Sequence, residues 1–332
     1  MAGWVLALGL AMPAVAEITA IRAGRVITDA AQPARGASTI LVENGRIIEI
    51  NDAAAALPAG AKVIDLSGKT VMPGLIDAHV HLTGTPDSQF WQEAVTTDEY
   101  SVAVGLANAA TTLRAGFTTV RDLGSGRLSG FAVRDAIANG IATGPRTLVS
   151  GPAISIIGGH GDVSGYRPEV NGAEQCAARV REASRAGADV IKITATGGVL
   201  SQQARGLGQH FTDAEMRAIV TTAHGLGLKV AAHAHGARGI EAAANAGVDS
   251  IEHGTFADAA GIEGSSRGER RTPTLQREDL RDGKRLLRLV VRRARRRIAD
   301  DERPDRRIEC SCGVRGKLLH RRKGCLQIAA DL

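Results

Sequence analysis

Hydrophobic and polar positions alternate in two different ways along the chain. From residue 17 to about residue 70, short apolar runs alternate with polar positions and are separated by turn signals. The clearest of these signals is Asn44-Gly45, between the runs STILVE and RIIEI, a pair typical of a tight β-hairpin turn. Residues 17–70 are therefore predicted to form a small N-terminal β-sandwich domain.

After residue 71 the period changes, and strand-length apolar runs alternate with helix-length segments. These helices are expected near residues 98–115, 128–139, 172–187, 212–227 and 237–247. Six strand-helix steps in a row predict a parallel sheet, and polar residues at the strand ends predict a barrel with its site at the C-terminal rim. Residues 71–258 are thus expected to form strands one to six of a (β/α)8 TIM-like barrel, in the α/β class.

The barrel pattern stops after strand six. Residues 259–332 hold 21 of the 41 Lys and Arg residues but 11 of the 35 Asp and Glu residues, which gives this tail a charge of +10 and the rest of the chain −4. A frameshift near residues 257–265 would account for an aberrant Arg-rich stretch without aromatic residues. The alternative is a genuine basic arm, whose segment LRDGKRLLRLVVRRARRRI could bind nucleic acid or an anionic membrane.

The first sixteen residues are apolar and end in Ala14-Val15-Ala16, the small-residue pattern that signal peptidase cleaves after. Residues 1–16 are therefore expected to be a signal peptide, and the chain is expected to be periplasmic or secreted. A buried N-terminal helix or a mis-set start codon are the alternatives. Since no later segment reaches the ~18 continuous apolar residues of a membrane span, no such span is expected.

Two histidines, His79 and His81, stand at the end of the first apolar strand of the predicted barrel. Side chains two positions apart on a strand lie on the same face, so both imidazoles can point into the barrel mouth and bind one metal ion, for which zinc is suitable. Taken alone, the pattern is also consistent with two ordinary polar residues.

Further polar residues follow the later strands. Lys192 lies between two isoleucines in DVIKITATGG, so it is expected in the barrel lumen if those isoleucines face the outer helices. On the fifth strand, LKVAAHAHG places His233 and His235 on one face, and the sixth strand supplies His253 in SIEHGT. The stretch GGHGD adds His160.

The segment PGLIDAHVHL resembles the amidohydrolase superfamily, whose first barrel strand ends in such a pair of histidines after a Pro-Gly turn and an Asp. Together with GGHGD, KITATGGV, HAHG and IEHGT, it is most similar to the branch related to imidazolonepropionase, which includes exported prolidase-like and Xaa-Arg-type dipeptidases. The resemblance covers roughly residues 17–258 and does not extend into the tail.

The resemblance implies a set of metal ligands and a pair of substrate contacts. The ligands are His79, His81, Lys192, His233 and His253, and the substrate contacts are His160 and His235. In many relatives the lysine is carboxylated and bridges two metal ions, so one or two zinc or similar ions are expected here. A lysine paired with an inward carboxylate is the alternative for Lys192, and hydrogen-bonded rim histidines are the alternative for the two substrate contacts.

The implied activity is hydrolysis of an amide or peptide bond by a metal-bound hydroxide, with a dipeptide or an N-acyl amino acid as substrate. Strands seven and eight of the barrel, and the aspartate on strand eight to which the family assigns proton transfer, have no counterpart in this sequence. The catalytic residue is therefore unknown, and impaired activity is expected. The body is expected to bind no nucleic acid, and a homo-oligomer is left open. The alternative function is a basic-tailed nucleic-acid or membrane binding protein that carries a relic barrel.

Overall fold

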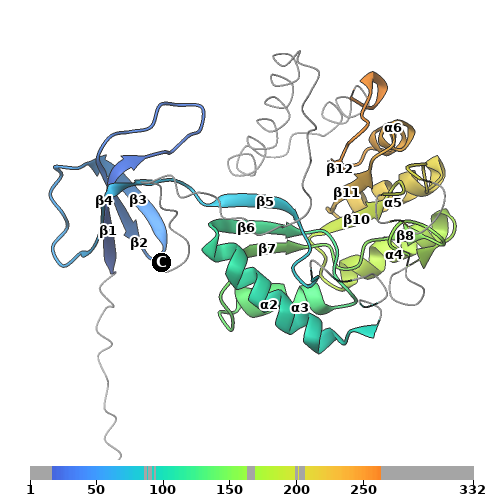
Figure 1. The fold of residues 1–332 in the computed structure, drawn as a ribbon, viewed down its shortest axis with the longest axis horizontal. Helices are drawn as coiled ribbons and strands as arrows, with labels where there is room; N and C mark the ends of the chain where they lie inside the picture. Colours follow the sequence, from blue (N-terminus) through green and yellow to red (C-terminus); the bar gives the residue numbers. More distant parts are fainter. Residues whose placement is uncertain are drawn as a thin grey trace, which may run out of the picture. The chain divides into compact units, whose positions relative to one another are not determined.

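The computed structural model describes residues 17–85, 88, 92, 95–162, 169–198, 201 and 206–262. They fall into two compact units, one with strands β1 to β4 and one with most of the strand-helix repeats (Figure 1). The expected signal peptide and residues 263–332 of the expected tail lie outside the described residues. Within the described residues, no helix combines the length and the apolar character that crossing a bilayer requires.

The first unit contains a four-stranded sheet in the order β3-β2-β1-β4. Its strands are β1 (Ile18–Val26), β2 (Ser38–Glu43), β3 (Arg46–Asp52) and β4 (Lys62–Val71). Both residues of the Asn44-Gly45 turn have positive φ, 50° and 73°, as the tightest hairpin turns require, so the predicted hairpin is confirmed. Among the described residues of this unit, the second sheet that a sandwich needs is not found.

The strand-helix repeats contribute two three-stranded sheets, ordered β5-β6-β7 and β10-β11-β12. The strands are β5 (Leu75–Val80), β6 (Phe117–Asp122), β7 (Arg146–Val149), β10 (Val190–Thr194), β11 (Lys229–Ala234) and β12 (Ser250–His253), with the short β8 (Ser155–Ile156) and β9 (Glu169–Val170). The helices are α2 (Asp98–Arg114), α3 (Ser129–Ala138), α4 (Ala173–Arg185), α5 (Asp213–Gly225) and α6 (Ala237–Ala246). Each expected helix is present at its expected place.

The largest hydrophobic core lies between the β10-β11-β12 sheet and helices α4 to α6. Ile191 and Ile193 belong to this core, as expected, so the alternating residue Lys192 points to the opposite face of the sheet. The parallel register places Thr194 beside His233 and His233 beside Glu252, and register partners share a face. The inner face of these three strands therefore carries a buried lysine, a histidine and a carboxylate.

Two aspartates fasten the starts of strands β10 and β12 to the preceding segments. Asp189 donates its backbone N–H to the carbonyl of Val149 and accepts the N–H of the same residue with its carboxylate, at 2.8 and 2.9 Å. Asp249 makes the same pair of bonds with Val230, both at 2.8 Å. Because each aspartate follows a helix and precedes a strand, the turn itself fixes the neighbouring strand in register.

Candidate metal centre

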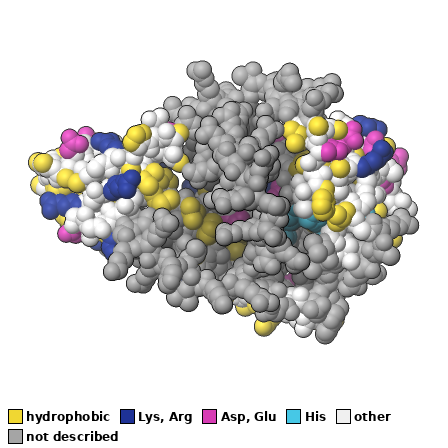
Figure 2. All heavy atoms as spheres, turned by 45° about the horizontal axis from the view of Figure 1, so that its top comes forward, with side chains coloured by type: hydrophobic (Ala, Val, Ile, Leu, Met, Phe, Trp, Pro, Cys, Tyr) yellow, Lys and Arg dark blue, Asp and Glu magenta, His cyan; other side chains and the backbone are white. Residues whose placement is uncertain are grey.

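The histidines predicted from the sequence lie together at the strand ends. The rings of His233 and His253 are 4.7 Å apart between centroids, and His79 lies 5.0 Å from His253 and 5.3 Å from His81. These residues come from β5, β11 and β12 or directly follow them, so one end of the strands carries the whole cluster. Histidine side chains are visible on the molecular face drawn in Figure 2.

The two residues expected to contact substrate belong to the same cluster. His235 lies 4.7 Å from both His233 and His253, and one ring nitrogen from each of these three residues lies within 4.8 Å of the others. The ring of His160 stacks on His233 with a centroid distance of 4.2 Å. The ring of His235 thus lies as close to the rings of the two expected ligands as these lie to each other.

His253 reaches this cluster through an unusual backbone conformation. Its neighbour Glu252 faces inward with His233, so a regular strand would point His253 to the opposite face. Instead His253 has a φ of 72°, in the left-handed region that non-glycine residues seldom adopt. Such strained residues concentrate at functional sites, where surrounding contacts hold them in place.

The second nitrogen of several rings is held by a hydrogen bond. His81 Nδ1 donates to the carbonyl of Gly124 at 2.9 Å, so the lone pair of its neutral ring is on Nε2. His79 Nδ1 bonds to the carboxylate of Glu252 at 3.0 Å, and His235 Nδ1 to the hydroxyl of Thr255 at 2.8 Å. Metal-bound histidines are commonly held in this way, with one nitrogen on an oxygen acceptor and the other on the metal.

Burial keeps the central rings neutral, which ligation requires. Burial is the main reason that the pKa of His253 falls to about 4, and electrostatic interactions with the neighbouring histidines and with Lys192 lower it further. The pKa of His233 is lowered strongly, first by burial and then by electrostatic interactions with His160, Lys192 and the other neighbouring histidines. A neutral imidazole offers a lone pair to a cation without first losing a proton.

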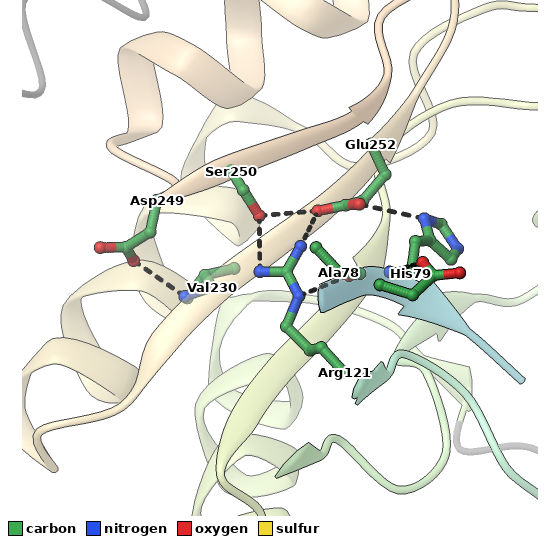
Figure 3. A network of polar contacts seen from close by, with 8 residues as sticks. Ala78, His79, Arg121, Val230, Asp249, Ser250 and Glu252 are labelled. Carbon is green, nitrogen blue, oxygen red and sulfur yellow. Dashed lines mark hydrogen bonds and ion pairs between the residues drawn. The ribbon is translucent and has the colours of Figure 1, made fainter. Parts of the chain in front are cut away.

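A carboxylate and a guanidinium form a network of polar contacts with His79 (Figure 3). Glu252 Oε1 accepts from Arg121 Nη2 at 2.7 Å and from the hydroxyl of Ser250 at 2.7 Å. Burial raises the pKa of Glu252, but the hydrogen bond from His79 and the charges of Arg121 and Lys192 outweigh it and bring the pKa to about 2. Lys192 therefore interacts electrostatically with the inward carboxylate of Glu252. Such a carboxylate is what the alternative to a carboxylated Lys192 requires.

A second buried carboxylate, Asp122 at the end of β6, supports His81 from the other side. Its two oxygens accept the backbone N–H groups of Leu82 at 2.9 Å and Gly124 at 3.1 Å. Leu82 follows His81 in the sequence, and Gly124 accepts the hydrogen bond from the His81 ring. Burial raises the pKa of Asp122 to about 7, against the effect of these two bonds. The strand end that carries His81 is thus tied to β6 by a side chain.

Residues 70–268 match the model of the amidohydrolase family. The chain belongs to this family. A solved structure described as a Xaa-Pro dipeptidase with bound methionine is 35% identical to this amidohydrolase, with a TM-score of 0.70 over 76% of the chain. A prolidase solved with N-methylphosphonate-L-proline is 32% identical, with a TM-score of 0.69 over 76% of the chain. The expected family and its prolidase-like branch are therefore confirmed.

An ochratoxinase from Aspergillus niger is 33% identical to the amidohydrolase over 73% of the chain. The chain spans 55% of that relative, 65% of the dipeptidase and 64% of the prolidase. The solved relatives support the TIM-barrel type of fold, and the hydrolases among these relatives support hydrolysis as the general reaction class.

The residues present in the amidohydrolase fit the divalent metal ion that its family usually binds. Within the described residues, Nε2 of His233 is buried and has no hydrogen-bond partner, which would be costly in a purely structural histidine. A methyl group on Gly198 would lie only 2.8 Å from this nitrogen, so only glycine at this position lets the backbone pass so close to the ring without a clash. A buried, neutral nitrogen that lacks a hydrogen-bond partner is suited to binding a cation.

We expect Gly198→Ala to weaken binding of a divalent metal ion on the order of 10-fold, because the added methyl group would press on the rings of His233 and His160. A competition titration with a chromophoric chelator measures this affinity. Gly225→Ala is the matched control, since no atom lies within 4 Å of the methyl group that it adds. An unchanged affinity in Gly198→Ala would contradict the placement of the metal beside His233.

Sequence reasoning did not find Arg121, Glu252 and Asp122 as parts of the site. Arg121 and Asp122 stand in FTTVRDLG and Glu252 stands in SIEHGT, beside residues that were considered for other reasons. Strand alternation could not have placed all three, because Arg121 and Asp122 are adjacent on β6 and Glu252 directly precedes the predicted ligand His253. Their partners lie far away in the sequence and could not have been inferred from it either.

Proposed function

We propose that the chain is a zinc-dependent hydrolase that cleaves the C–N bond of dipeptides or N-acyl amino acids. The observation that carries this proposal is the group of neutral histidines with ring nitrogens gathered at one end of the strands. The substrate class is supported by the similarity to a Xaa-Pro dipeptidase and a prolidase. The ochratoxinase relative supports the broader class of amide hydrolases.

Each residue has a defined task in this proposal. His79, His81, His233 and His253 hold zinc through their ring nitrogens, with Lys192 added as a carbamate if two ions bind. His160 and His235 bind and orient the substrate from the rim, each held by a hydroxyl group at Nδ1. A bound divalent ion supplies a more acidic water molecule and polarises the carbonyl to be attacked. Hydrolysis adds this water across the C–N bond and leaves a carboxylate and an amine.

The test is zinc content and hydrolysis measured on the same preparation of the full chain. Zinc would be counted by mass spectrometry, with and without bicarbonate during expression, and activity measured on Xaa-Pro and Xaa-Arg dipeptides and N-acyl amino acids. We expect one or two ions per chain, and activity that disappears with a chelator and returns with zinc. A folded chain that binds no zinc with excess metal and bicarbonate would overturn the proposal.

A further inference from the structure

Glu252 stands at the centre of a buried network that joins three strands (Figure 3). It lies on β12, its partner Arg121 lies on β6 and its partner His79 lies on β5. Arg121 is fixed in turn by the carbonyl of Ala78 at 2.7 Å and the hydroxyl of Ser250 at 3.2 Å. The guanidinium is thus anchored beside the backbone of the strand that carries His79.

Both carboxylate oxygens of Glu252 accept hydrogen bonds, and each oxygen has different partners. Oε1 accepts from Arg121 and Ser250, whereas Oε2 accepts from Nδ1 of His79. An ionised carboxylate can only accept hydrogen bonds, so the proton of a neutral His79 must lie on Nδ1. The lone pair is then on Nε2.

The two histidines of the first strand therefore have different supports. His81 donates to a neutral backbone carbonyl, and His79 donates to a buried anion. An anionic acceptor makes the imidazole a stronger electron donor and fixes both the tautomer and the orientation of the ring. The side chain of Glu252 is only 8% exposed, so water screens this effect little.

We propose that Glu252, held by Arg121, is a positioning residue that fixes His79 as the Nδ1–H tautomer and so strengthens the metal bond to its Nε2. This inference rests on the proposed metal site and goes beyond its ligands. Arg121 acts on His79 indirectly, through Glu252. Its fork of N–H groups fixes the direction of the Glu252 carboxylate and balances its charge.

Glu252→Gln provides a sharp test, because an amide has one accepting oxygen and one donating nitrogen. The oxygen would remain with Arg121 and Ser250, whose groups both donate to it. The amide nitrogen would then face Nδ1 of His79, which must accept, and the ring proton would move to Nε2. We expect this substitution to reverse the tautomer of His79 and to weaken zinc binding about 10- to 100-fold.

The tautomer would be measured by nitrogen-15 NMR on the full chain labelled at histidine, after removal of metal with a chelator. The signals of His79 are identified by their loss in His79→Asn. Zinc affinity would be measured by competition titration, and the ligand field by the visible spectrum of the cobalt-substituted chain. Arg121→Lys keeps the charge but loses the fork, so we expect it to shift affinity and spectrum in the same direction by a smaller factor.

Asp189→Asn is the matched control. Asp189 also forms a half-buried ion pair, with Arg134 at 3.0 Å, but it precedes β10 and so lies at the opposite end of that strand from the histidines. We expect it to lower stability while zinc affinity and the His79 tautomer stay unchanged. A loss of zinc affinity in Asp189→Asn equal to that in Glu252→Gln would overturn the proposal by showing a general folding effect.

The remaining outcomes separate the two proposals. Zinc binding and a His79 tautomer in Glu252→Gln equal to those of the unmodified chain would overturn the role of Glu252. If the unmodified chain binds no zinc, the proposed function fails, while reversal of the tautomer would still support the role of Glu252. If Glu252→Gln does not fold, Arg121→Lys serves as the test. Zinc affinity and a cobalt spectrum in Arg121→Lys equal to those of the unmodified chain would contradict the proposal.

Discussion

His233→Ala is expected to lower kcat/KM by more than about 100-fold and to remove most of the bound zinc. Loss of a residue that only supports a metal ligand reduces affinity or activity about 10- to 100-fold, and loss of a ligand should exceed this. His233 has the most central position, with three other histidine rings within 4.7 Å of its own between centroids. The neighbouring rings of His160 and His235 are held in their own positions by hydrogen bonds to Ser201 and Thr255.

The experiment combines zinc content with kcat/KM on the best dipeptide of the panel. His224→Ala is the matched control, because His224 lies on α5 and pairs with Asp249, where it is partly exposed. The control should keep both zinc and activity. Full activity and full zinc content in His233→Ala would refute the assignment of His233 as a ligand.

Arg121→Met is expected to lower the free energy of unfolding by about 3–5 kcal/mol. The substitution removes the one cation that is hydrogen-bonded to the buried carboxylate of Glu252 among the described residues, and a buried charge that loses its partner is far more costly than the loss of a surface pair. Pairing it with Glu252→Leu removes that charge, so the double variant should recover a large part of the loss. Urea unfolding followed by circular dichroism measures both changes.

The control for this prediction is Arg127→Met, which breaks the ion pair with Asp98. Both side chains of that pair are partly exposed, so its loss should change stability by about 0–1 kcal/mol. Equal effects of Arg121→Met and Arg127→Met would show that the buried pair contributes no more than a surface pair.

Local patterns were sufficient to predict much of the fold and of the histidine cluster. The Asn44-Gly45 turn depends on two adjacent residues, and the shared face of His233 and His235 depends on the two-residue period of a strand. Such features are encoded within a few positions. They can therefore be derived before any long-range contact is known.

The network around Glu252 could not be derived in this way, because Arg121 and Glu252 are separated by 131 positions. Their pairing is decided by the three-dimensional arrangement of β6 and β12, which no local pattern contains. The position of His253 likewise depends on a positive φ that departs from the strand period. Long-range pairing and local backbone strain are the two kinds of information that periodicity lacks.

The paired bonds of Asp189 and Asp249 act at the starts of the strands, whereas the histidines act at their ends. Mutations at the rim can therefore accumulate without loosening the contacts that set the strand register. Such a separation makes a protein evolvable, because new substrate preferences can be explored while the scaffold stays intact. An ancestor with these two turns could diversify at its rim while its descendants kept the same strand order.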